Sequence, residues 1–194
     1  MKKIAFLALF GGLFTQQANA QELSLGVKGG LNVAKVTNTI FNDEKTRAAI
    51  YLGGFARVTF NESWSVQPEL FYSGQGLKYN VPILGEYKVR LNYINLPVMV
   101  QYHLIPEFYL EAGPQLGFMV AAKNKHGNTT VDIQNHTRGV DFGLGFGLGY
   151  DFDFGVGIGA RYNFGLTDVY DHDESQKNSV AQFGLYYTLG KFKR

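Results

Sequence analysis

The sequence predicts an all-β protein, an eight-stranded antiparallel up-and-down transmembrane β-barrel, and three observations lead to this fold class. First, apolar residues alternate with glycine or polar residues along most of the chain, with the longest such run at residues 138–167. A period of two is the side-chain period of a β-strand. Second, eight such segments are joined alternately by polar loops and tight turns, which is the layout of outer-membrane barrels. Third, roughly forty apolar side chains share one face, too many for the interior of an eight-stranded barrel.

Residues 1–20 have the pattern of a signal peptide. Two lysines precede an apolar run at residues 4–14, and Ala18-Asn19-Ala20 matches a small-x-small cleavage site. A transmembrane anchor is the weaker interpretation, because the apolar run is too short to cross a bilayer as a helix. We therefore expect export, cleavage after Ala20 and a barrel domain over residues 21–194.

The predicted strands follow one another in chain order. We expect them at residues 23–33, 49–60, 64–77, 89–103 and 108–122, at 138–150 and 154–167 as one hairpin, and at 179–189. Polar loops are expected at residues 35–47, 78–88, 123–137 and 168–178, and tight turns at 61–63, 104–107 and 151–153. In an outer-membrane barrel the loops are extracellular and the turns periplasmic.

Each strand is justified by apolar residues at every second position. In the first four strands, one face carries residues from Leu23 to Val33, Leu52 to Phe60, Trp64 to Tyr72 and Ile94 to Tyr102. In the last four strands, the corresponding residues run from Phe108 to Val120, Val140 to Tyr150, Phe154 to Leu166 and Ala181 to Leu189. The opposite face is rich in Gly, Ser, Asn and Gln, with isolated charges, and suits a crowded interior.

A soluble barrel, such as a lipocalin, would turn the apolar face inward. The volume argument opposes that arrangement. A solvated outer surface would also be richer in Lys and Glu than the polar face of these strands is. Aromatic residues near strand ends on the apolar face fit the girdles at membrane interfaces; they are Trp64, Tyr72, Tyr102, Tyr150, Tyr162 and Tyr187. We therefore expect the apolar face to contact lipid.

Composition removes several function classes. The chain has no Cys, which excludes disulfides and thiolate sites. Without Lys2 and Lys3, the 18 Lys+Arg become 16 against 16 Asp+Glu, so no basic footprint for nucleic acid exists.

The glycine run at 145–149 lacks the G-x-G-x-x-G spacing and a following helix, so we expect its glycines to make room for bulky neighbours, not to bind a nucleotide. The acidic stretch at 171–174 is better explained as an exposed loop than as a cation site, and we expect no cofactor or metal.

Six charged residues fall on the inward face: Lys28, Arg57, Glu69, Glu111, Asp141 and Arg161. Charges inside a narrow barrel must pair or stay hydrated. If the turn at 61–63 is symmetric, Arg57 faces Gln67 and lies diagonal to Glu69. If Phe152 is the centre of its turn, Asp141 lies diagonal to Arg161. We expect an ion-pair network that plugs the lumen, in preference to a selectivity constriction, because eight strands leave little lumen.

Several motifs resemble the PorT-like outer-membrane β-barrel family, a group of porin-like barrel domains. They are GVKGGLN at residues 26–32, SVQPELFYS at 65–73, YINLPV at 93–98 and EAGPQ at 111–115. The end of the last strand resembles the signal read by the outer-membrane assembly machinery, with Gln182, Gly184, Tyr187 and Leu189 as its residues. The resemblance implies a location in the outer membrane of a Gram-negative cell, contact with outer-membrane lipid and with the assembly machinery, and an accessory role in secretion as one alternative.

The function that these features favour is a non-enzymatic structural or interaction barrel that displays four extracellular loops. A narrow channel for small solutes is the alternative. A hydrolase at the outer rim would need converging Ser, His and Asp side chains, and no spacing among His126, His136 and His172 requires one. No motif identifies an extracellular partner.

Overall fold

The computed structural model describes residues 22–36, 44–81, 85–127, 129–134, 139–168 and 176–193. The predicted signal peptide and its cleavage site lie outside these ranges. The strands are β1 (Glu22–Val36), β2 (Glu44–Thr59), β3 (Trp64–Val81), β4 (Gly85–Ile105), β5 (Phe108–His126), β6 (Thr129–Asp132), β7 (Val140–Asp151), β8 (Val156–Asp168) and β9 (Lys177–Lys193). No helix among the described residues is long and apolar enough to cross a membrane.

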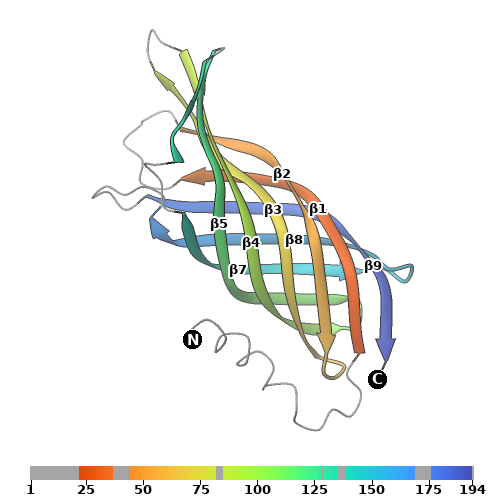
Figure 1. Cartoon of the computed structure of the whole chain (residues 1–194). Coiled ribbons are helices and arrows are strands. Elements are labelled where there is room, and N and C mark those ends of the chain that lie inside the picture. The colour runs from red at the N-terminus through yellow and green to blue at the C-terminus, as the bar shows by residue number, and fades with distance from the viewer. Residues whose placement is uncertain are drawn as a thin grey trace, which may run out of the picture.

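Eight of these strands form a closed ring (Figure 1). Each pairs antiparallel with its neighbours in the chain, β5 pairs with β7, and β9 pairs with β1 to close the barrel. The short strand β6 pairs with β5 above the ring and adds a ninth strand. The predicted fold class is therefore confirmed, since a closed antiparallel ring has no free edge across its length.

Strands extend further than the alternation predicts. The segment at 78–88, expected as a loop, is mostly a hairpin, because β3 runs to Val81 and β4 begins at Gly85. The segment at 123–137 contains the end of β5 and all of β6. The ends of β3, β4 and β5 project beyond the other strands at the top of Figure 1. These strand ends pair with each other outside the apolar belt. Their outward positions are polar, as at Lys78 and Lys88, whereas Tyr79 and Tyr87 stack at their inward positions.

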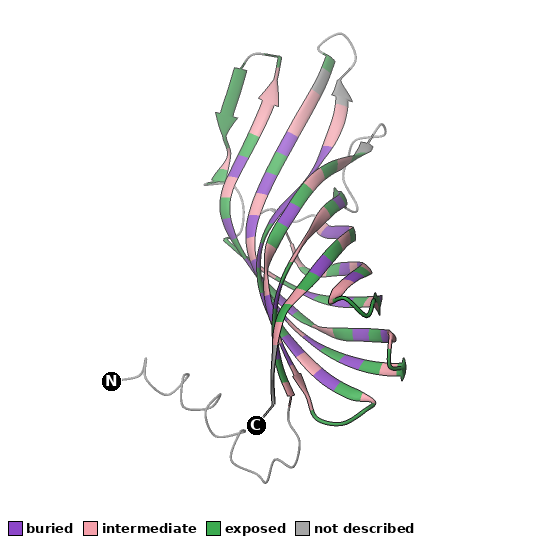
Figure 2. Cartoon of the chain, turned by 90° about the vertical axis from the view of Figure 1, so that its right-hand side faces the viewer, coloured by how far each residue is buried: buried purple, intermediate pink, exposed green. Residues whose placement is uncertain are grey.

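The apolar face points outward, as predicted. Along β5 and β7, exposed and buried residues alternate (Figure 2). Large apolar residues on every strand of the ring are exposed, including Leu52, Leu70, Phe146 and Leu185. The inward positions hold buried polar residues together with buried aromatic rings. This is the reverse of a soluble protein, whose large apolar residues are mostly buried.

Inward glycines lie across from large inward side chains. Gly149 is the register partner of Tyr109, and a methyl group at Gly149 would come within 2.3 Å of the Tyr109 ring. Gly157 has the same relation to Tyr186, with a separation of 2.0 Å. The expectation that these glycines make room for bulky neighbours is confirmed, because each one gives space to a ring on the adjacent strand.

The three tight turns gather at one end of the barrel, which we call the turn end; the other end is the loop end. At the β2–β3 turn, Asn61 Oδ1 accepts hydrogen bonds from the amides of Ser63 and Trp64, both at 2.9 Å. This turn, which the Asn61 side chain stabilises, places Val58 opposite Val66. That is the symmetric register predicted for this hairpin.

Candidate functional site

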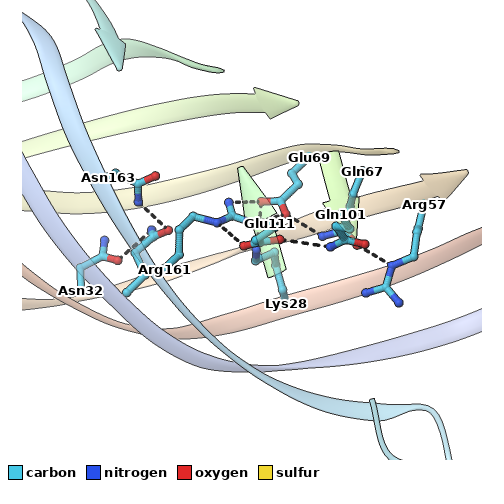
Figure 3. Close-up of polar contacts among 10 residues, drawn as sticks. Lys28, Asn32, Arg57, Gln67, Glu69, Gln101, Glu111, Arg161 and Asn163 are labelled. Carbon is cyan, nitrogen blue, oxygen red and sulfur yellow. Dashed lines mark hydrogen bonds and ion pairs between the residues drawn. The ribbon is translucent and has the colours of Figure 1, made fainter. Parts of the chain in front are cut away.

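The candidate site is an ion-pair cluster inside the barrel, which we call the lumen network. It consists of Lys28 from β1, Glu69 from β3, Glu111 from β5 and Arg161 from β8 (Figure 3). These strands come from around the whole ring, and each residue occupies an inward position of its strand. The network thus joins opposite walls of the barrel through side chains alone.

Glu69 and Arg161 are at the centre of the network. Glu69 accepts hydrogen bonds from Lys28 Nζ at 2.9 and 3.0 Å and from Arg161 Nη1 and Nη2 at 2.9 and 2.7 Å. Arg161 Nε also donates to Glu111 Oε1 at 2.6 Å. The Glu69 side chain is 0% exposed and that of Arg161 is 4% exposed. Two cations therefore neutralise two carboxylates in a site with little solvent contact, as a buried ion cluster requires.

Two glutamines complete the hydrogen bonding of the carboxylates. Gln67 Nε2 donates to Glu69 at 2.7 Å, and Gln101 Nε2 donates to Glu111 at 3.1 Å. These amides were not among the predicted site residues. Both lie at inward positions that the sequence pattern indicates. Gln67 lies two residues before Glu69, and Gln101 lies directly across from Glu111.

Arg57 lies nearer the turn end and pairs with a carboxylate other than the predicted one. Its Nη1 donates to Asp151 Oδ2 at 2.9 Å, and its Nε donates to Gln67 at 2.8 Å. Its facing residue is therefore the predicted Gln67, but its ion pair is with Asp151 and not with Glu69. Asp151 lies at the end of β7, whereas the sequence placed it in the turn.

Aromatic rings surround the Arg57 guanidinium. Its central carbon lies 5.7 Å from the ring centre of Phe55, 5.1 Å from that of Tyr109 and 5.6 Å from that of Tyr186. These are cation–π distances. Tyr186 also donates to Asp151 at 2.7 Å, so the aromatic group and the ion pair form one layer across the lumen.

The predicted pairing of Asp141 with Arg161 is wrong. Asp141 instead accepts hydrogen bonds from Thr167 at 2.7 Å and Asn178 at 3.0 Å. The reason is the β7–β8 turn: Phe152 pairs with Val156, and Gly155 adopts a positive φ of 84°. This three-residue turn with glycine in the left-handed region shifts the register by four residues from the one assumed. It places Gly147 opposite Arg161, so that Asp141 lies six residues further along β7.

A layer of amides lies on the loop side of the lumen network. Asn163 donates to Gln182 at 3.0 Å, and Gln182 donates to Asn32 at 3.0 Å. Asn32 in turn donates to Ser73 at 2.9 Å. The lumen is therefore crossed by three successive polar layers, formed around Arg57, around Glu69 and around Gln182.

The residues predicted as an assembly signal lie on both faces of β9. Gln182 points inward into the amide layer, and Gly184 gives space to the Tyr51 hydroxyl, which would lie 2.2 Å from a methyl group there. Tyr187 and Leu189 are exposed on the outer face. The strand continues to Lys193, which pairs with Glu22, so four more residues follow Leu189 in the barrel wall.

The cavities of the lumen are small where the polar layers lie. A cavity of about 20 Å³ lies beside Lys28, Glu111 and Arg161, room for about one water molecule. Another of about 10 Å³ lies beside Asp141 and Asn178. A cavity of about 580 Å³ opens at the turn end and stops at Arg57, His103 and Asp151. In the part of the chain that the structure describes, no group of three His, Asp or Glu residues could hold a metal ion.

Comparisons with known proteins agree with this architecture. The family model described as the outer membrane protein beta-barrel domain matches residues 14–171. Among solved structures, Neisserial surface protein A superposes with a TM-score of 0.56 at 11% identity, covering 86% of this chain and 97% of that one. The attachment invasion locus protein Ail of Yersinia pestis has a TM-score of 0.49 at 17% identity, with 88% and 98% covered. No curated protein sequence matches the chain.

The match to the family model covers most of the chain, and the superposition on the Neisserial protein shows the same fold. The barrel with an outward apolar face and an inward polar one meets what a membrane barrel requires. The chain belongs to the family of outer membrane protein β-barrel domains, and its place is the outer membrane.

Proposed function

We propose that the protein is a non-enzymatic structural or interaction barrel whose lumen is closed and whose loop end faces the cell exterior. The observation that carries the proposal is the stack of polar layers; the cavities beside them, lined by described residues, measure about 20 and 10 Å³. A hydrated ion does not fit such spaces. With the lumen closed, the surfaces available for interaction outside the cell and within the membrane are the loop end and the lipid-facing wall.

The layout of the barrel supports the proposal that the loop end faces the cell exterior. Tight turns and both ends of the strand series gather at one end, and in bacterial outer-membrane barrels that end is periplasmic. The signal peptide at residues 1–20, with cleavage after Ala20, and a Gram-negative source are part of this proposal. The narrower PorT-like assignment and a secretion-accessory role remain predictions from the resemblance.

Planar-bilayer recording tests the closed lumen. The wild-type barrel should give no single-channel steps at 1 M KCl. A porin with an open lumen, recorded under the same conditions, shows that the measurement detects a conducting barrel. Reproducible single-channel steps from the wild-type protein would favour the narrow channel and overturn the proposal.

A further inference from the structure

A small cavity on the loop side of the lumen is lined by four amide side chains whose oxygens accept no hydrogen bond. The cavity measures about 10 Å³, which is about one water-sized sphere. Each of these amide residues is at most 7% exposed, and its side-chain oxygen is buried without a hydrogen-bond partner among the described residues. Asp141 is the one charged residue among the described residues that line the cavity. We call the carboxylate and the four amides the oxygen site: Gln75, Gln115, Asp141, Asn163 and Asn178.

The hydrogen bonds of the amide layer fix which atom of Asn163 is left free. Asn32 Nδ2 donates to the carbonyl oxygen of Gly74 at 2.8 Å, and a carbonyl can only accept. Asn32 Oδ1 therefore accepts from Gln182 Nε2, and Gln182 Oε1 accepts from Asn163 Nδ2 (Figure 3). The free atom of Asn163 is consequently its oxygen.

Asp141 has no cation beside it. Its carboxylate accepts hydrogen bonds from Thr167 and Asn178, which are neutral, and it forms no ion pair with any residue in the described part of the chain. The lumen network offers no cation, since its two cations already neutralise its two carboxylates. A carboxylate held inside a narrow barrel needs a compensating charge. Because Asn178 Nδ2 donates to this carboxylate, the free atom of Asn178 is likewise its oxygen.

A cation satisfies the oxygen site better than a water molecule does. The buried side-chain atoms that lack a partner at this cavity, among the described residues, are all acceptors. A water molecule has only two hydrogens to donate, so two of the four amide oxygens would stay unpaired, and unpaired buried acceptors are destabilising. A cation attracts all four amide oxygens and the carboxylate at the same time.

Charge and size select the class of cation. A monovalent ion neutralises the single carboxylate, whereas a divalent ion would leave a net positive charge in the lumen. Mg²⁺ keeps several of its water molecules in protein sites, and this cavity has room for about one. Carbonyl oxygens replace the hydration shell of K⁺ in channel filters, and amide side chains supply the same kind of oxygen.

We propose that the oxygen site binds one dehydrated alkali cation, Na⁺ or K⁺. Its five ligand residues come from β3, β5, β7, β8 and β9, so the bound ion links five strands of the ring. The sequence-based expectation of no metal considered the acidic and histidine-containing loops, and it did not consider amide oxygens inside the barrel. The proposal goes beyond the proposed function and depends neither on the closed lumen nor on the orientation of the barrel.

The test is urea unfolding of the barrel in phosphatidylcholine vesicles at increasing NaCl or KCl, with choline chloride keeping the ionic strength constant. A ligand that binds only the folded state lowers the equilibrium constant of unfolding. For one site, this constant should fall about tenfold for each tenfold rise in Na⁺ or K⁺ above the dissociation constant. MgCl₂ and CaCl₂ at the same ionic strength should have no such effect. Equal unfolding constants in choline, sodium and potassium chloride over the whole range would overturn the proposal.

Two variants and a control locate the ion. Asp141→Asn removes the charge of the site and should abolish the dependence on Na⁺ or K⁺. Gln115→Met removes one oxygen, which has no other partner, and should raise the apparent dissociation constant about tenfold or more. The control is Asp153→Asn, an exposed carboxylate in the β7–β8 turn, which should keep the wild-type dependence. A heat-dependent gel shift identifies folded variants, and Gln115→Met keeps the test decisive if Asp141→Asn does not fold.

The remaining outcomes each contradict one part of the proposal. A folded Asp141→Asn or Gln115→Met barrel with the wild-type dependence on Na⁺ or K⁺ would place the ion elsewhere and overturn the site. A dependence on Ca²⁺ without one on Na⁺ or K⁺ would overturn the assignment to a monovalent cation.

Discussion

Substituting Glu69 with Gln tests whether the lumen network is a dry ion cluster. Glu69 accepts five hydrogen bonds from three side chains: two from Lys28, two from Arg161 and one from Gln67. Glutamine keeps the size of the side chain, removes its charge and turns an amide group toward these donors. Arg161 still has Glu111 as a partner, but Lys28 loses its carboxylate and the network gains one net positive charge.

The expected cost follows from burial. The Glu69 side chain is 0% exposed and that of Lys28 is 11% exposed, so water can replace only a small part of the lost interaction. Removing one member of a buried ion pair costs about 3–5 kcal/mol, because the other charge stays buried without compensation. We expect the free energy of unfolding to fall by about that amount.

The assay is urea unfolding of the barrel in lipid vesicles, followed by the fluorescence of Trp64. This is the single tryptophan of the chain, and it lies exposed on the outer face, so its emission shifts when it leaves the lipid. A matched control is Glu62→Gln in the exposed β2–β3 turn, expected within about 0.5 kcal/mol of the wild type.

A double variant separates charge from packing. Adding Lys28→Met to Glu69→Gln restores neutrality and should recover part of the loss, with a coupling energy of about 0.5–3 kcal/mol. If Glu69→Gln unfolds at the same urea concentration as Glu62→Gln, the carboxylate is solvated and the lumen is not closed as we describe it.

Two further predictions concern the barrel wall. Gly149→Ala should destabilise the barrel by about 1–3 kcal/mol, because its methyl group would overlap the Tyr109 ring. Gly139→Ala, whose methyl group would meet no atom within 4 Å, should be neutral in the same urea titration. Equal costs for the two variants would contradict the packing of Tyr109 against Gly149. Leu144→Arg, near the middle of the outward face of β7, should lower the free energy of unfolding in vesicles by about 2–4 kcal/mol. Leu104→Arg at the turn end should lower it by about 1 kcal/mol or less. A soluble, folded Leu144→Arg protein would argue against contact between this face and lipid.

Local alternation and the volume of the apolar face were enough to predict the barrel. Every second residue is apolar along the strands of the ring, and because so many large residues cannot fit inside eight strands, they were placed toward lipid, as at Leu52 and Phe146. The same period placed Lys28, Glu69, Glu111 and Arg161 on the inward face, where the structure brings them together. A strand with one face toward the lumen and the other toward lipid cannot shift its register by one residue without exchanging the two faces. This is why this part of the prediction succeeded.

Partner assignments depend on register, and register depends on turns. The β2–β3 turn was predicted correctly because Asn61 holds it in its symmetric form. The β7–β8 turn was assumed to centre on Phe152, whereas Gly155 adopts the left-handed conformation that ends a three-residue turn. Asp-Phe-Gly at 153–155 carries this signal, and recognising it would have separated Asp141 from Arg161.

The projecting strands could not be predicted from alternation. Above the apolar belt the outward positions of β3 and β4 are polar, as at Lys78 and Lys88, although Tyr79 and Tyr87 lie inward. The outward apolar residues that identified the strands below are therefore missing there. Long-range partners such as Asp151 for Arg57, 94 positions apart, are likewise set by the closure of the whole ring and not by any one hairpin.

Thiol accessibility across the barrel tests the closed lumen most directly. The chain has no cysteine, so Ser24→Cys, which lines the cavity at the turn end, and Glu62→Cys in the adjacent turn each carry a single thiol. In vesicles with oriented barrels, a charged, membrane-impermeant thiol reagent should modify both from the turn end and neither from the loop end. Modification of Ser24→Cys from the loop end, with Glu62→Cys protected on that side, would mean that the reagent passes the lumen network and would contradict the account.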